Sequence, residues 1–274
     1  DIKRQVERAE RANAQLEKEI QNNKDKVNFF ALKGGKMRKL AAKLRDEVEE
    51  LEDSKVEVRK EDRTIKPFTI TCQEDIGSVI VKFNSVDVLH DGKPVTRKVD
   101  IELRKGDKLH IIGPNGIGKT TLLEKMAKRA EKGVTIQDGI IVGYYRQDFS
   151  TLDFEKSAYQ ELAKVLKRLD DQLLRRVAAS MLLGAEQLAA KIGLLSEGQK
   201  GLLMFAYLRL LQPGLLILDE PTNHINFRHI PVIAEALKAY EGPMIIVSHV
   251  HEFVKEVGVT QTLDLGNYRI ACSK

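Results

Sequence analysis

The sequence predicts an α/β domain built on a mostly parallel sheet, preceded by an α-helical coiled-coil hairpin. Apolar residues follow the four-and-three rhythm of a coiled coil between residues 2 and 58, whereas beyond residue 67 they gather into short runs. These runs alternate with helical segments, which is typical of sheets whose strands are parallel. The pattern therefore divides the chain into two segments, residues 1–66 and 67–274.

The first segment has the pattern of two helices that fold back on each other. The coiled-coil rhythm covers residues 2–30 and resumes over residues 37–58. Gly34 and Gly35 lie between the two runs, where a turn is expected. Residues 64–71 are polar and contain a proline, so we place the end of the hairpin near Lys66.

The second segment opens with strand-like runs at residues 78–83 and 99–103, and a reversal at residues 90–92 predicts antiparallel pairing. Later apolar runs predict the parallel strands, which are residues 108–112, 142–145, 215–220 and 243–249. A sheet of this kind is covered by helices on both faces. Residues 151–212 are helical in pattern almost throughout, and we expect them to form a helical subdomain.

Composition restricts the class of protein. The chain has 31% charged residues and lacks an apolar run near the ~18 residues that a membrane-spanning helix needs, so we expect no membrane partner. Cys72 and Cys272 fit no disulfide framework or metal spacing, which favours a reducing, cytoplasmic location. The sequence starts at Asp1 inside a periodic segment, so we expect it to be part of a longer polypeptide.

A glycine-rich loop follows the predicted strand 108–112 and precedes a helical segment. It reads GPNGIGKTT and fits the pattern G-x-x-x-x-G-K-[ST]. In such a loop, glycines let backbone N–H groups surround phosphate, Lys119 supplies a positive charge, and the Thr120 hydroxyl ligates Mg²⁺. The nucleotide-binding residues predicted here are Gly113, Asn115, Gly116, Gly118, Lys119, Thr120 and Thr121.

An acidic pair ends the predicted strand 215–220. LLILDE places apolar residues in a buried strand and then Asp219 and Glu220 at its carboxyl end, where parallel sheets bind ligands. Asp219 is predicted to help hold Mg²⁺, and Glu220 to polarise the water that attacks the γ-phosphate of ATP. Combined with the glycine-rich loop, this pair predicts a P-loop NTPase that binds and hydrolyses ATP.

Three further motifs point to a family. Gln147, the LSEGQ of residues 195–199 and His249 stand in order with the two motifs above, and this order resembles the ABC ATPases throughout residues 68–274. The resemblance implies that Gln147 lies near Mg²⁺ and the attacking water, and that His249 is the switch histidine. It also implies that Ser196 and Gly198 contact a γ-phosphate.

In ABC ATPases the LSEGQ-type signature loop faces the nucleotide of a second domain, in a head-to-tail pair. The chain has one copy of each motif. The resemblance therefore implies that Ser196 and Gly198 act in trans on ATP held by a second ABC domain. That partner is either another part of the same polypeptide or a second copy of the chain, and we expect the isolated chain to have low ATPase activity.

The sequence PTNH at residues 221–224 and the charged hairpin before the domain resemble the ABC-F proteins, which join two ABC domains by a helical linker and act on ribosomes. Residues 1–66 would be that linker and 67–274 the second ABC domain. The stretch 24–45 is strongly basic, with Asp25 as its only acid, and suits contacts to the phosphates of rRNA or tRNA. Its alternative role is a solvated coiled-coil face.

Four residues depart from the family pattern. Glu197 replaces a glycine of the usual LSGGQ and brings an acid close to a phosphate, Asn226 replaces the aspartate of PTNHLD, and Val250-His251 replace the commoner DR. These departures predict altered engagement of the signature loop, and one of the two composite sites is expected to be slow or mainly structural.

Three other function classes share part of this pattern. The ATPase subunit of an ABC transporter would carry the same motifs, but it leaves the hairpin unexplained. In chromosome- or repair-type ATPases the coiled coil lies between the two Walker motifs, whereas here it precedes them. Intact Lys119, Asp219 and Glu220 disfavour a binding module with vestigial motifs. We therefore expect an ATPase that acts on the ribosome.

Overall fold

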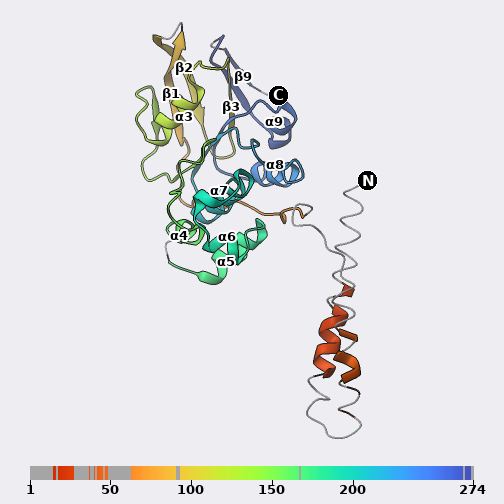
Figure 1. Ribbon diagram of the computed structural model, residues 1–274. Coiled ribbons are helices and arrows are strands. Elements are labelled where there is room, and N and C mark those ends of the chain that lie inside the picture. The colour runs from red at the N-terminus through yellow and green to blue at the C-terminus, as the bar shows by residue number, and fades with distance from the viewer. Residues whose placement is uncertain are drawn as a thin grey trace. The chain divides into compact units, whose positions relative to one another are not determined.

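The chain divides into two compact units, Asp1–Arg63 and Thr64–Lys274, and Figure 1 gives the element labels used below. The sequence pattern placed the boundary near Lys66. The structure is a computed structural model, and only the backbone of His90 and of residues 269–272 is described. It describes residues 15–16, 18–27, 37, 40, 42–45, 47–48, 63–90, 93–166, 168–267 and 269–272.

Within residues 15–48 the described part of the first unit is helical, for example over residues 18–27 and 42–45. Ile20, Asn23 and Val27, which the coiled-coil rhythm places on the seam, are buried, and so is Val48 in the second run. Met37 and Leu40 were assigned to the seam as well, but each is 42% exposed. The Gly34-Gly35 turn lies outside the described residues, so the hairpin as a whole stays a prediction.

The second unit is built around a six-stranded sheet with the strand order β5-β6-β7-β3-β8-β9. Neighbouring strands are parallel except for the antiparallel pair of β8 and β9. The mostly parallel sheet is therefore confirmed. Its strands are β3 (Lys108–Ile112), β5 (Val142–Tyr145), β6 (Leu215–Asp219), β7 (Met244–Val247), β8 (Gln261–Asp264) and β9 (Arg269–Cys272).

A second, antiparallel sheet has the strand order β2-β1-β4. Its strands are β1 (Val81–His90), β2 (Lys93–Leu103) and β4 (Val134–Ile136). The pairing of β1 and β2 continues to His90 opposite Lys93, so the chain reverses where the sequence predicted. This sheet is the antiparallel subdomain that the sequence anticipated.

The alternating side chains of the main sheet divide the core in two. Leu216 and Leu218 of β6 belong to the cluster that contains the helical region, whereas Leu215 and Ile217 join the cluster of the antiparallel sheet. Successive residues of a strand point to opposite faces, so apolar layers cover both sides of the sheet. This double burial explains why β6 and β7 are almost entirely apolar.

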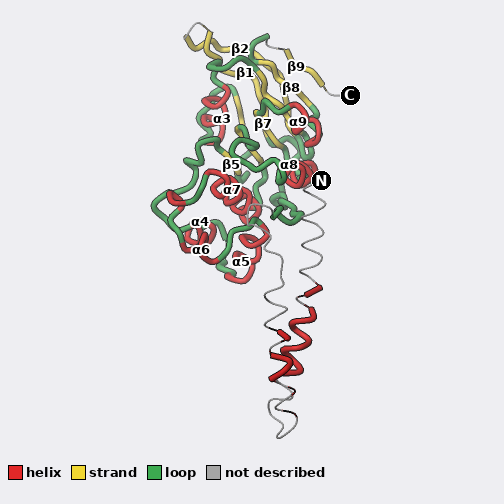
Figure 2. Tube along the Cα trace, turned by 45° about the vertical axis from the view of Figure 1, so that its right-hand side comes forward, coloured by secondary structure: helices red, strands yellow, loops and turns green. Residues whose placement is uncertain are grey.

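Helices α3 (Lys119–Ala127), α8 (Ile230–Lys238) and α9 (His251–Val257) connect the strands. The region predicted to be helical contains α4 (Ala158–Ala163), α5 (Asp171–Ser180), α6 (Ala185–Ala189) and α7 (Glu197–Leu211), separated by loops. The ribbon and the tube views both place α4, α5 and α6 together, far from β1 and β2 (Figures 1 and 2). None of the described helices has the length and apolar composition needed to cross a membrane.

Candidate active site

The glycine-rich loop links the end of β3 to the start of α3, as the sequence predicted. Gly118 caps α3 with φ 104°, and Gly116 has φ 80°. These are left-handed conformations that side chains with a Cβ rarely adopt, which explains why glycine occupies both positions. The ammonium of Lys119 donates hydrogen bonds to the carbonyls of Gly113 (2.8 Å) and Pro114 (3.2 Å). The loop thus presents backbone N–H groups and a fixed positive charge together.

A cleft of about 470 Å³ opens beside this loop and gathers residues from distant parts of the chain. Gln147 follows β5, Asp219 and Glu220 end β6, and His249 follows β7. The predicted site residues that line the cleft are Asn115, Gly116, Gly118, Lys119, Thr120, Thr121, Gln147, Asp219, Glu220 and His249. Parallel strands end at the same edge of a sheet, so the motifs meet there despite their separation in sequence.

Asp219 is 1% exposed, and its Oδ2 atom is buried with no hydrogen-bond partner among the described protein atoms. Burial raises the pKa of this carboxyl, while a hydrogen bond with Thr120 and the charge of Lys119 act in the opposite direction. No group of three or more His, Cys, Asp or Glu side chains forms a metal site in the described part of the chain. Mg²⁺ needs few protein ligands, since water and phosphate supply the rest. The unpartnered Asp219 oxygen beside Thr120 therefore fits a Mg²⁺ ion.

Glu220 and His249 form a close pair at the cleft. The carboxylate accepts a hydrogen bond from the backbone N–H of His249 (3.3 Å), and its Oε1 atom lies 3.3 Å from Nε2 of the same residue. Glu220 is 7% exposed and has φ 48°. A positive φ outside glycine stores strain and is concentrated at functional sites. The backbone turn at Glu220 therefore directs its carboxylate toward His249.

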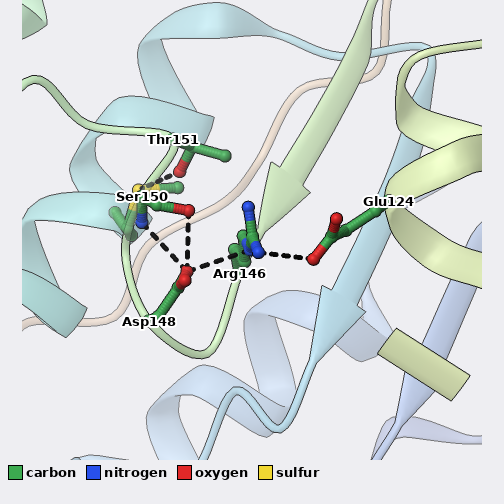
Figure 3. Close-up of polar contacts among 6 residues, drawn as sticks. Glu124, Arg146, Asp148, Ser150 and Thr151 are labelled. Carbon is green, nitrogen blue, oxygen red and sulfur yellow. Dashed lines mark hydrogen bonds and ion pairs between the residues drawn. The ribbon is translucent and has the colours of Figure 1, made fainter. Parts of the chain in front are cut away.

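Arg146 fixes the start of the loop that carries Gln147 (Figure 3). Its guanidinium pairs with Glu124 on α3, and its Nε lies 3.0 Å from Oδ1 of Asp148. Asp148 in turn accepts hydrogen bonds from the backbone N–H (3.1 Å) and the hydroxyl (2.8 Å) of Ser150. These contacts tie the Gln147 loop to the helix that begins at the phosphate loop.

His110 is a site-supporting residue that the sequence reasoning missed. It is 6% exposed in β3, and its Nε2 lies 3.1 Å from the carbonyl oxygen of Ser248. Burial lowers the pKa of this imidazole, so the neutral ring donates its Nε2–H to that carbonyl. Since Ser248 precedes His249, the bond holds the turn that Glu220 also contacts. A polar residue inside the apolar strand KLHII was the available signal.

Comparison with known proteins identifies the domain. The sequence matches the family described as ABC transporter over residues 96–223. The chain carries an ABC ATPase domain. The solved structure described as an ATP binding subunit of an ABC transporter has the same fold, with a TM-score of 0.59 at 18% identity over 70% of this chain and 90% of that one.

The curated relatives of this ABC domain include ATP-binding proteins and members of the ABC transporter F family. The chain is 32% identical to the probable ATP-binding protein YbiT of Escherichia coli O157:H7, over 66% of the chain and 35% of the relative. It is 29% identical to ABC transporter F family member 5 of Arabidopsis thaliana, over 66% of the chain and 27% of the relative. The chain spans roughly a third of the length of such relatives.

The signature residues of the ABC domain lie outside the cleft. Ser196 caps α7, and its side chain and that of Gln199 each bond the other's backbone N–H (3.2 and 2.9 Å). Glu197 is the acid that the sequence analysis expects close to a phosphate. Its carboxylate pairs with the ammonium of Lys200 at 2.8 Å. Because this ion pair satisfies the acid within its own helix, the cost of bringing a phosphate near it is reduced. Neither Ser196 nor Gly198 lines the cleft that gathers the other motifs.

Further residues of the ABC cleft were not predicted. Leu89 reaches it from β1, and Asn223, Val247 and Val250 complete its lining. The side chain of His90, which follows Leu89, lies outside the described part. Leu89 lies beside Gly118, 3.9 Å from the position a Cβ would take there. The antiparallel sheet thus supplies an apolar wall to the cleft.

The pH dependence of hydrolysis should report the environment of Glu220. Burial raises the pKa of its carboxyl above the ordinary value of 4.5. A general base acts only when ionised, so kcat/KM should fall with decreasing pH, and the midpoint of the fall should lie above 4.5. Steady-state ATPase assays across pH measure this midpoint. A midpoint at or below the ordinary value would remove the buried Glu220 from the role of base.

Proposed function

We propose that the chain is the linker and second ABC domain of an ABC-F type protein, which uses ATP-dependent closure of paired ABC domains to act on the ribosome. The observation that supports this proposal most is that the signature residues do not line the cleft in which the other motifs meet. One cleft gathers Lys119, Asp219, Glu220 and His249, whereas Ser196 and Gly198 do not line it. A second domain is needed to complete the site, as the pairing of ABC domains requires.

Each residue of the cleft has a definite task in this proposal. Lys119 and the loop N–H groups bind the phosphates of ATP, and Thr120, Gln147 and Asp219 hold Mg²⁺. Mg²⁺ supplies charge neutralisation to the transferred phosphoryl group. Glu220 accepts the proton of the attacking water, and His249 holds the carboxylate in place through the contacts described above. Ser196 and Gly198 bind the γ-phosphate held by the partner domain.

The basic stretch 24–45 supplies the proposed contact with rRNA or tRNA. Lys24, Lys26, Lys43 and Arg45 are exposed within its described part. Exposed basic residues on a helix suit phosphate contacts, whose strength falls steeply with added salt. The proposal places the protein in the cytoplasm, where ribosomes are found.

The proposal is tested by sedimenting ribosomes with the full-length protein carrying Glu220→Gln, with and without ATP. A clamp that closes on ATP but does not hydrolyse it should accumulate on ribosomes, so co-sedimentation should require ATP and weaken with salt. The contrary result is co-purification with a membrane permease, with ATP leaving the amount of protein that sediments with ribosomes unchanged. That result would identify the chain as the ATPase subunit of a transporter.

A further inference from the structure

A second cleft, of about 530 Å³, lies at the opposite end of β5 from the cleft beside the glycine-rich loop (the ATP cleft). Ile141, directly before β5, lines it, whereas Gln147, just after β5, lines the ATP cleft. The two clefts share no residue. The proposed ATPase mechanism therefore makes no use of this second cleft.

Among the residues that the structure describes, three arginines and no acid line the second cleft. Arg168 precedes α5, Arg176 lies on α5 and Arg209 lies near the end of α7. Arg209 is held by a hydrogen bond from Nη1 to the Ser180 hydroxyl (3.1 Å), which fixes one guanidinium at the wall. An arrangement of this kind matches the oxygens of a phosphate group.

The nearest acids in the sequence do not neutralise these charges. Asp170 caps α5 through the backbone N–H of Leu173 (2.8 Å). Asp171 accepts hydrogen bonds from Tyr159 and from Arg175, not from Arg176. Within the described residues, Arg168 and Arg176 have no ion pair. Burial lowers the pKa of Arg209, and the charge of Arg176 adds to the effect, so the two guanidinium groups repel each other.

The remaining walls suit the rest of a nucleotide. Thr69 and Thr71 offer exposed hydroxyls, because residues 68–71 alternate between buried and exposed positions. Gln212 adds an amide. The apolar part of the wall is formed by Ile141, Val165, Leu166, Leu173, Val177, Leu210 and Leu211. An apolar wall with a few convergent polar groups, in a volume of this size, is typical of a ligand site.

We infer that the second cleft binds a nucleotide phosphate, with the phosphate on Arg168, Arg176 and Arg209 and the base against the apolar wall. The same chemistry is offered by a free nucleotide and by a single-stranded segment of RNA. The inference stands apart from the proposed function, since it needs neither ATP hydrolysis nor a second ABC domain.

The test compares the full chain with the double variant Arg168→Gln/Arg176→Gln. Calorimetry measures the binding of AMP, and fluorescence anisotropy measures the binding of a fluorescent single-stranded RNA. Charge-assisted hydrogen bonds are worth about 1.5–3 kcal/mol each, so affinity at the cleft should fall at least ~10-fold. The ATP cleft is untouched by these substitutions, so any binding there contributes equally to both proteins. Loss of RNA binding assigns the cleft to RNA, and loss confined to AMP assigns it to a free nucleotide.

Arg175→Gln is the matched control. Arg175 is the neighbour of Arg176 on α5 and is similarly exposed, but its charge is already paired with Asp171 at 2.8 Å. We expect Arg175→Gln to bind both probes as the unaltered chain does. The thermal unfolding midpoint of the double variant Arg168→Gln/Arg176→Gln should be unchanged. Equal losses in Arg175→Gln, or unaltered binding of both probes in the double variant, would overturn the inference.

Discussion

Replacing Glu220 with glutamine should nearly abolish ATP turnover while nucleotide binding persists. A general base contributes on the order of 10²- to 10⁴-fold in rate, and glutamine has the same shape without a proton-accepting carboxylate. The amide oxygen can still accept the hydrogen bond that His249 donates from its backbone N–H. The turn at the cleft should therefore survive. Single-turnover hydrolysis and equilibrium ATP binding measure the two effects separately.

Glu252→Gln provides the control for this change. Glu252 lies in the first turn of α9, a few residues beyond His249, and is exposed. The substitution removes the same charge outside the cleft, so turnover should remain within about twofold, as for most surface substitutions. Undiminished hydrolysis in Glu220→Gln, or an equal loss in Glu252→Gln, would contradict the role given to Glu220.

The sequence predicted β3 and β5 well because each is a short, mostly apolar run that is largely buried. β3 and β5 match the predicted residues 108–112 and 142–145 end for end. The strands that were missed carry weaker signals. β8 reads QTLD, with only Leu263 buried, and β4 has three residues. Such strands are defined by partners far away in the chain, which local pattern does not reveal.

The candidate site shows the same division between local and distant information. Motif spacing placed the phosphate loop and the acidic pair, because each depends on one strand end. Leu89 comes from the other sheet, and nothing in its neighbourhood marks it as part of the cleft. The pairing of Glu197 with Lys200 was open to prediction, since residues three apart lie on one helix face.

Replacing Lys119 with methionine should weaken ATP binding roughly 10- to 100-fold. Charge-assisted hydrogen bonds to phosphate contribute about 1.5–3 kcal/mol, and each ~1.4 kcal/mol is tenfold in affinity. The lysine's contacts within the protein are with two loop carbonyls, those of Gly113 and Pro114. Loss of these contacts should change the free energy of unfolding little. Calorimetric ATP binding and thermal unfolding of the variant measure both quantities.

Lys108→Met makes the same chemical change at the other end of β3 and should have the opposite outcome. Lys108 is 5% exposed, and its ammonium donates to the carbonyls of Lys238 (2.7 Å) and Val257 (2.9 Å) at the ends of α8 and α9. Burying those carbonyls without a donor costs about 1–3 kcal/mol each, so the domain should lose stability while its ATP affinity stays the same. If Lys108→Met weakened ATP binding as much as Lys119→Met, the effect of the Lys119 charge would not be local. The assignment of the cleft as the ATP-binding site would then be wrong.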